Sequence, residues 1–427
     1  MKDINKKFNI IKNKIIIISI IIIIIMNFSI VNADDEDEQD NDENEIENSL
    51  IEENTLNDEE KVETGTNLSN TTPQINSRRY AIFDRKSKTC IYGKDENKET
   101  AMASTTKIMT AIIVLENTEN LNELVTVSQK AAGTGGSRLG LKKDDKLTIN
   151  DLLYGLLMRS GNDAAVELAI DTAGSVEEFA GLMNQKAKEL GLEKTNFVTP
   201  HGLDNPKHYT TAVELAKITD YALNNKKFCE IVDTQFATIN INGQAKDLKN
   251  TNELLGKING VYGVKTGFTN NAGRCLVTAI KNDKIDIIIV ALGADTRKDR
   301  ANDTIKLLKY VEKNYSVQNL EDYAQTEFEK WKEINEKRIY INKNANNINT
   351  KLENIPIKEI LTKDELESEI TNITHLEAPI EKETRIGTLL IKSGGKIVEE
   401  INIVTDQDII KKGIIDYIKI FAKCIVE

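Results

Sequence analysis

Histidine and cysteine are scarce in this chain of 427 residues, which has three His and four Cys. The cysteines stand far apart, at Cys90, Cys229, Cys275 and Cys424, and no Cys-x-x-Cys pair occurs. This spacing argues against a zinc cluster and against a disulfide scaffold. We therefore expect no metal and no cofactor, and we expect an apolar core to provide the stability.

A basic patch is also missing from the body of the chain. The net charge is −12, and residues 34–63 alone contain 16 Asp or Glu against one Lys, so the rest is close to neutral. A run of like charges repels itself and buries nothing, which predicts an acidic disordered linker over 34–77. Nucleic acid is therefore not an expected partner.

The first 33 residues have the pattern of an export signal. Five lysines precede Ile15–Ile25, a run that only Ser19 interrupts, and Val31-Asn32-Ala33 offers a small-x-small cleavage site. This order predicts a signal peptide over 1–33, cleaved after Ala33, with an uncleaved membrane anchor as the alternative. The protein is then expected outside the cytoplasm, at the outer face of the cytoplasmic membrane or in the cell wall.

The hydrophobic pattern of the body predicts an α+β fold in several parts. Residues 78–100 alternate as two antiparallel strands, helical spacing follows to about residue 225, and "CLVTAI" and "DIIIVALGA" are strands before a last helix. The simplest layout is one antiparallel sheet with a helical cluster beside it, over 78–315. Spaced β-type runs and the Gly394-Gly395 turn predict a small all-β domain over 316–404, in which we expect Trp331 to pack.

The last segment, 405–427, reads as an amphipathic helix. One side would carry mainly apolar residues and the other mainly charged ones: Ile410, Ile414, Tyr417, Ile418, Phe421, Cys424 and Ile425 against Lys412, Asp416, Lys419 and Lys423. We expect it to lie in the plane of a membrane surface, with its lysines at anionic head groups. The alternative is a helix docked on its own domain.

Three short motifs carry the candidate chemistry. They are Ser104-Thr105-Thr106-Lys107, Ser160-Gly161-Asn162 at a break between two helices, and Lys265-Thr266-Gly267 at a predicted strand. Each is weak alone, because serine often caps a helix and lysine is usually a solvated charge. Their order and settings together point to one site.

The residue types suit acyl transfer by a serine. Ser104 needs an adjacent base, and Lys107, one helical turn away, can serve if burial and the charge of Lys265 depress its pKa. Ser160 would relay the proton to a leaving amine, and Asn162 would hold Lys107 or a substrate amide. The N–H of Ser104 and a strand N–H just after Gly267 would form an oxyanion hole.

At these motifs the chain resembles the D-alanyl-D-alanine carboxypeptidase family of low-molecular-mass penicillin-binding proteins. The segments "SGNDAAVELA", "HGLDNPKHYTTAVELA", "VKTGFTNNAGRCLV" and "GIIDYIKIF" are also similar to family segments. The resemblance spans about 78–427. It implies a transpeptidase/β-lactamase-like domain, then a small β-domain and an amphipathic anchor.

The resemblance also implies roles and partners. Ser104 would be the acylated nucleophile and Lys107 its base, with Ser160 and Asn162 in the second motif. Substrate would be bound by Lys265, Thr266, Gly267, Arg300 and His201. Arg297 and Arg274 remain alternatives to Arg300, and a loop-holding role remains open for His201. "GTGGSRLGL" (133–141) resembles a glycine-rich loop beside the site, and the partners would be peptidoglycan stem peptides and β-lactam antibiotics.

Two other functions remain as alternatives. A β-lactamase shares the first and third motifs, but class A enzymes use an additional glutamate, and no Glu-x-x-x-Asn occurs between Asn162 and Lys265. A catalytically silent penicillin-binding scaffold is the other, and the intact motifs argue against it. The sequence therefore favours a serine-type D-Ala-D-Ala carboxypeptidase.

Overall fold

The computed structural model describes residues 72–335, 339–342, 348–355, 359–372 and 375–426. The predicted signal peptide and most of the predicted acidic linker therefore lie outside the described residues. The end of that linker is held by the next domain, since the backbone N–H groups of Asn76 and Ser77 both donate to the carboxylate of Asp303.

A five-stranded antiparallel sheet joins the two ends of the first domain. Its order is β2-β1-β9-β8-β7, so the hairpin that opens the domain pairs with a strand some 200 residues later. The strands are β1 (Arg79–Asp84), β2 (Thr89–Lys94), β7 (Val261–Thr269), β8 (Gly273–Lys281) and β9 (Asp286–Ala294). The predicted layout of one antiparallel sheet from terminal hairpins is confirmed.

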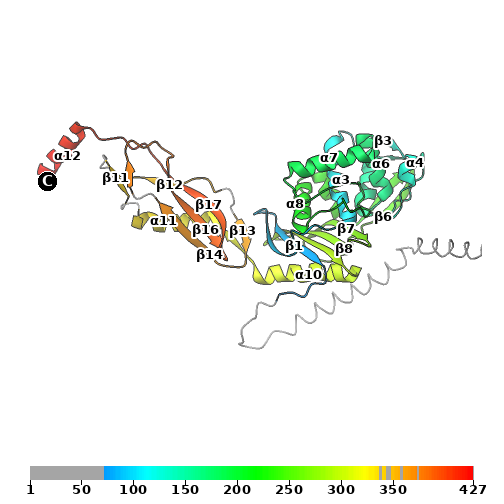
Figure 1. Cartoon of the computed structure of the whole chain (residues 1–427). Helices are drawn as coiled ribbons and strands as arrows, with labels where there is room; N and C mark the ends of the chain where they lie inside the picture. Colours follow the sequence, from blue (N-terminus) through cyan, green and yellow to red (C-terminus); the bar gives the residue numbers. More distant parts are fainter. Residues whose placement is uncertain (1–71, 336–338, 343–347, 356–358, 373–374, 427) are drawn as a thin grey trace, which may run out of the picture. The chain divides into compact units, whose positions relative to one another are not determined.

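Helices cover both faces of this sheet. Figure 1 shows α10 (Arg297–Asn314) along one face and the helical cluster on the other. The cluster contains α3 (Lys107–Asn117), α4 (Gln129–Ala132), α5 (Ile149–Met158), α6 (Asn162–Ala173), α7 (Val176–Glu189), α8 (Ala212–Ala222) and α9 (Lys226–Asp233). In α3 every residue from Lys107 to Val114 is buried, as expected of a helix that is apolar around most of its circumference.

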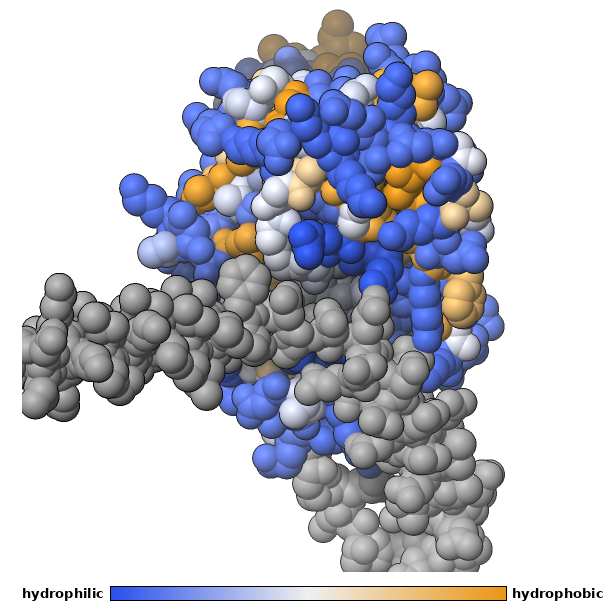
Figure 2. All heavy atoms as spheres, turned by 90° about the vertical axis from the view of Figure 1, so that its right-hand side faces the viewer, coloured by the Kyte–Doolittle hydropathy of each residue, from blue (hydrophilic) through white to orange (hydrophobic). Residues whose placement is uncertain are grey.

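Local sequence signals explain several helix starts. Thr148 and Asp151 form a reciprocal capping box at α5, and the hydroxyls of Ser175, Thr211 and Thr296 cap α7, α8 and α10. Two small antiparallel pairs of strands were not predicted from the sequence: β3 (Leu124–Thr126) with β4 (Lys146–Thr148), and β5 (Phe236–Ile241) with β6 (Gln244–Lys249). On the face in Figure 2, hydrophilic residues predominate over smaller hydrophobic patches.

The region after residue 315 is built mainly of strands, with one helix that the sequence analysis did not predict. The strands are β10 (Ser316–Asn319), β11 (Tyr340–Asn342), β12 (Thr350–Leu352), β13 (Glu359–Thr362), β14 (Leu366–Asn372), β15 (His375–Glu377), β16 (Arg385–Ser393) and β17 (Lys396–Thr405). Helix α11 (Leu320–Asn335) buries Leu320, Ala324, Phe328 and Trp331, which recur at helical spacing. Trp331 stacks on Phe328 with ring centroids 5.7 Å apart, so its predicted packing role is confirmed.

The glycine turn and the last helix also follow the sequence pattern. Gly394 and Gly395 have φ of +55° and +76° and join β16 to β17, where two consecutive positive φ values favour glycine. Helix α12 (Ile414–Val426) is shorter than the predicted 405–427, because it starts after Gly413 and leaves Ile410 and Lys412 outside it. Ile414, Ile418 and Phe421 are 80, 62 and 70% exposed. Among the described residues, none of the helices has the length and apolar character needed to cross a bilayer.

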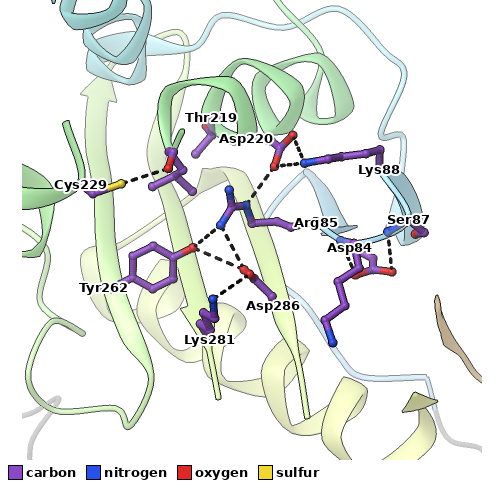
Figure 3. Close-up of polar contacts among 12 residues, drawn as sticks. Asp84, Arg85, Ser87, Lys88, Thr219, Asp220, Cys229, Tyr262, Lys281 and Asp286 are labelled. Carbon is purple, nitrogen blue, oxygen red and sulfur yellow. Dashed lines mark hydrogen bonds and ion pairs between the residues drawn. The ribbon is translucent and has the colours of Figure 1, made fainter. Parts of the chain in front are cut away.

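A polar cluster closes one end of the five-stranded sheet (Figure 3). The guanidinium of Arg85 donates to Asp220 at 2.9 Å, to Tyr262 at 3.0 Å and to Asp286 at 3.3 Å. Lys88 binds the other oxygen of Asp220 at 2.8 Å. Strand β1 is thereby tied to α8, β7 and β9 at the end of the sheet remote from Gly267.

Candidate active site

The first motif forms a tight turn that leads into a buried helix. A 3-10 turn, η1 (Ala103–Thr106), precedes α3, and Ala103 is buried with φ +48°. The hydroxyls of Thr105 and Thr106 donate to the carbonyls of Met102 and Ala103, which fixes the turn. Ser104 is held in η1, just before α3, and is partly exposed.

The side chain of Lys107 is fully buried and has three polar neighbours. Its Nζ lies 2.8 Å from Oγ of Ser104, 2.7 Å from Oδ1 of Asn162 and 3.0 Å from the carbonyl oxygen of His201. Asn162 and His201 can each accept one N–H. A neutral amine has two N–H donors and one lone pair, so its lone pair would point at the Ser104 hydroxyl.

The electrostatics favour that neutral form. Burial lowers the pKa of Lys107 well below its ordinary value, the charge of Lys265 lowers it further, and Asp163 partly opposes both. Burial also lowers the pKa of Lys265, to about 7, with a further contribution from Arg300. The site therefore holds two lysines whose charges disfavour each other.

The second motif supports the site from the break between α5 and α6. Ser160 is buried with φ +60°, a strained conformation for a residue with a side chain. Asn162 accepts from Lys107 and donates through Nδ2 to the carbonyl of Gly135 at 2.7 Å. A Cβ at Gly136 would lie 2.6 Å from that nitrogen, so glycine is required where the predicted glycine-rich loop meets Asn162.

The third motif lies on β7, directly against the nucleophile. A Cβ at Gly267 would be 3.0 Å from the backbone nitrogen of Ser104, so the strand approaches η1 closely. The N–H of Ser104 and that of Phe268, the first after Gly267, are then the candidate oxyanion donors. The Thr266 hydroxyl is 2.8 Å from that of Thr251, and Lys265 donates to the carbonyl of Thr266 at 3.0 Å.

Of the three candidate arginines, Arg300 is the one whose charge acts on Lys265. It is 5% exposed on the first turn of α10, and it contributes to the lowered pKa of Lys265. Its Nε donates to Oε1 of Glu253 at 2.7 Å and its Nη2 to Oε2 at 2.9 Å. Arg274 instead stacks on Phe268, with its guanidinium carbon 3.8 Å from the ring centroid.

His201 meets the site through its backbone. Its carbonyl accepts from Lys107, whereas its ring Nδ1 accepts from the N–H of Leu203 at 3.2 Å. Burial, with Lys107 and His208, lowers the pKa of His201 to about 3, so the ring is neutral. The ring contact favours the loop-holding role left open by the sequence.

Three supporting residues were missed by the sequence reasoning. Asp163 accepts from the N–H groups of Leu139, Gly140 and Leu141 at 2.8–2.9 Å and so anchors the glycine-rich loop. Its position next to Asn162 was an available signal. His208 contacts the Thr106 hydroxyl at 2.8 Å, and Glu253 pairs with Arg300. His208 lies in the quoted segment "HGLDNPKHYTTAVELA", whereas nothing in the local sequence marks Glu253.

Known proteins are similar to this chain in both sequence and fold. The family model described as D-alanyl-D-alanine carboxypeptidase matches residues 66–296, and that of the penicillin-binding protein 5 C-terminal domain matches 329–411. The chain belongs to the D-alanyl-D-alanine carboxypeptidase family. A member from Bacillus subtilis, D-alanyl-D-alanine carboxypeptidase DacF, is 32% identical over 348 residues, which are 79% of this chain and 87% of that protein.

Solved structures agree with this family membership. The Streptomyces K15 DD-transpeptidase is 33% identical with a TM-score of 0.54, and the match covers 56% of this chain and 98% of that one. Penicillin-binding protein 5 from Haemophilus influenzae is 25% identical with a TM-score of 0.63, over 79% and 98% of the two chains. The carboxypeptidase family thus accounts for both the sheet-and-helix domain and the following region of strands.

Proposed function

We propose that this D-Ala-D-Ala carboxypeptidase removes the terminal D-alanine of peptidoglycan stem peptides through an acyl-enzyme on Ser104. The observation that carries the proposal is the environment of Lys107. Two acceptors occupy its donors, and the Ser104 hydroxyl lies 2.8 Å from its Nζ. That arrangement supplies a serine with a general base and requires no histidine.

Acylation begins with proton transfer from Ser104 to Lys107. The Ser104 oxygen forms a bond to the carbonyl carbon of the penultimate D-Ala, and the carbonyl oxygen becomes an oxyanion held by the N–H groups of Ser104 and Phe268. The C–N bond then breaks. The leaving amine receives the proton from Lys107, with Ser160 as the relay, and free D-Ala departs.

Deacylation uses Lys107 again, first as the base for water and then as the acid for the Ser104 oxygen. Water gives a proton to the neutral Lys107 and attacks the ester carbon, and the C–O bond to Ser104 breaks. The proton returns to the Ser104 oxygen, which restores the resting enzyme. A β-lactam ring acylates Ser104 in the same way, and its ring-opened product stays attached and leaves slowly.

The substrate carboxylate is assigned to the cationic side of the site. Lys265 in its protonated form, the hydroxyl of Thr266 and the guanidinium of Arg300 would bind it. Arg300 is supported over Arg274 and Arg297 by its electrostatic effect on Lys265. A carboxylate bound there would favour the charged form of Lys265.

Mass spectrometry after incubation with penicillin tests the nucleophile. We expect one covalent adduct, on the peptide that contains Ser104, and release of D-Ala from an acylated D-Ala-D-Ala peptide by the untreated enzyme. Ser104→Ala should lose both. An adduct on another residue, or rapid penicillin turnover with no lasting adduct, would contradict the proposal.

We further propose that the protein is exported and that α12 holds it at the outer face of the membrane. The exposed apolar residues of α12 and its lysines support this position. Ile418→Asp with Phe421→Asp should abolish cosedimentation with anionic vesicles, while Asp416→Asn on the polar side should not weaken it. Equal binding of both variants would contradict the anchor, and an intact N-terminus on the mature protein would contradict cleavage after Ala33.

A further inference from the structure

Arg300 and Glu253 form a buried ion pair beside the third motif. The side chains are 6% and 7% exposed, and the pair is bidentate through Nε and Nη2 of the arginine. A guanidinium is planar and has five N–H donors, and two of its edges fit a carboxylate. Glu253 binds the edge formed by Nε and Nη2.

The second edge of the guanidinium, formed by Nη1 and Nη2, is not the one that Glu253 binds. Within the described part of the chain, the side-chain hydrogen bonds of Arg300 go to Glu253. Both N–H groups of Nη1 and the second N–H of Nη2 are left over, and one from each nitrogen can together bind another carboxylate. Arg300 can therefore keep Glu253 and bind a substrate carboxylate at the same time.

The backbone places Glu253 next to the catalytic strand. Thr251, two residues earlier, contacts the Thr266 hydroxyl at 2.8 Å, and its N–H donates to the carbonyl of Met158 at 3.1 Å. Met158 lies two residues before Ser160. Residues 251–253 therefore bridge the second and third motifs, and Glu253 reaches from this bridge to α10.

We propose that Glu253 is a positioning residue that orients Arg300 for the terminal carboxylate of the substrate. Because Glu253 holds one edge of the guanidinium, the Arg300 side chain stays in one rotamer and presents its other edge in a fixed plane. The charge of Glu253 also compensates Arg300, so that the buried site does not hold an uncompensated permanent cation. This inference rests on the proposed function and adds a residue that fixes its specificity.

The test compares two substrates that differ only at the C-terminus. An N-acylated D-Ala-D-Ala is assayed as the free acid and as the primary amide, with wild-type enzyme and Glu253→Gln. Active sites are counted by penicillin adduct, so that only folded enzyme enters the rates. We expect Glu253→Gln to lower the preference for the acid by roughly tenfold, mostly as a higher KM, with amide hydrolysis within about twofold of wild type.

Three further variants make the result specific. Glu253→Asp keeps a carboxylate and should restore part of the acid preference. Arg300→Gln should lose that preference, and adding Glu253→Gln to it should cause no further loss. Asp220→Asn, which removes a similarly buried carboxylate from Arg85 at the remote end of the sheet, should leave the preference unchanged.

The possible outcomes are separable. An equal fall for acid and amide, an unchanged preference, or an increased one would overturn the positioning role of Glu253. If Glu253→Gln yields too little folded enzyme, the same comparison with Glu253→Asp decides, since an Asp variant with full wild-type selectivity and an unchanged KM also contradicts the role. Failure of the wild type to form a Ser104 adduct or to release D-Ala would instead contradict the proposed function itself.

Discussion

The two ends of the central sheet use charge in opposite ways. At the remote end, Arg85 and Lys88 meet the carboxylates of Asp220 and Asp286 (Figure 3). At the other end, Lys107 meets a hydroxyl, an amide and a carbonyl. The first arrangement stabilises the charge of Arg85, and the second favours the neutral form of Lys107.

The pKa shifts have the signs that these partners dictate. Burial by itself would lower the pKa of Arg85, but Tyr262, Asp286 and Asp220 outweigh it and raise that pKa. Burial lowers the pKa of Lys107, and Lys265 adds to the effect instead of opposing it. Pairing with carboxylates thus separates a structural cation from a lysine that can act as a base.

The largest expected effect comes from making the charge at position 107 permanent. Lys107→Arg should reduce the rate of acylation by penicillin about 10³-fold, because a guanidinium cannot take up the serine proton. Stopped-flow or quenched-flow acylation rates measure this. Lys88→Arg is the control, because its contact with Asp220 needs only a positive charge. Similar losses in both variants would remove the contrast between the two ends.

Removing the charge of Lys265 should shift the pH dependence of the acylation rate. Lys107 must be neutral to act, so acylation rises with pH as Lys107 loses its proton. Lys265→Gln removes one cause of the lowered pKa of Lys107, so that pKa rises and the acidic limb moves to higher pH. At pH values on the acidic limb, we expect the acylation rate of Lys265→Gln to be about tenfold to hundredfold lower than that of the wild type. Profiles of acylation rate against pH measure it.

The same pH profiles, measured for a variant that keeps the charge at position 265, provide the control. Lys265→Arg retains the positive charge and should leave the acidic limb close to that of the wild type. An acidic limb at the same pH in Lys265→Gln would show that the charge of Lys265 does not act on Lys107.

The smallest expected effect on catalysis belongs to the remote end. Arg85→Leu leaves Asp220 and Asp286 without their shared partner, and should reduce the free energy of unfolding by about 2–3 kcal/mol. Thermal unfolding and urea titration measure this. The acylation rate per folded molecule should stay near that of the wild type, and a large fall in that rate would contradict a purely structural role for this end.

Much of the fold could be predicted because its signals are local. Alternation gave the hairpin of β1 and β2, and apolar spacing with a Ser-Gly-Asn break gave α5 and α6. Helix α11 was missed among β-type runs although Leu320, Ala324, Phe328 and Trp331 follow helical spacing. The hairpin of β5 and β6 has mostly exposed residues, so its sequence carried little alternation to detect.

The site was predictable in its motifs and not in its supports. Ser104, Lys107 and Asn162 come together in the structure, as their order in the chain suggested. Glu253 and His208 reach the site only through the tertiary fold, from segments 47 and 102 residues away from their partners. A short sequence motif identifies the reacting groups. The groups that hold them in place depend on tertiary contacts, which no local sequence pattern encodes.

The proposed mechanism depends on a neutral Lys107 amine in the resting enzyme. NMR of lysine labelled with ¹³C at Cε and ¹⁵N at Nζ measures this directly, with Lys107→Arg to assign the signal. We expect Lys107 to titrate well below its ordinary pKa of 10.5 and to be unprotonated where the enzyme is active. A Lys107 signal that stays protonated up to pH 10.5 would contradict it.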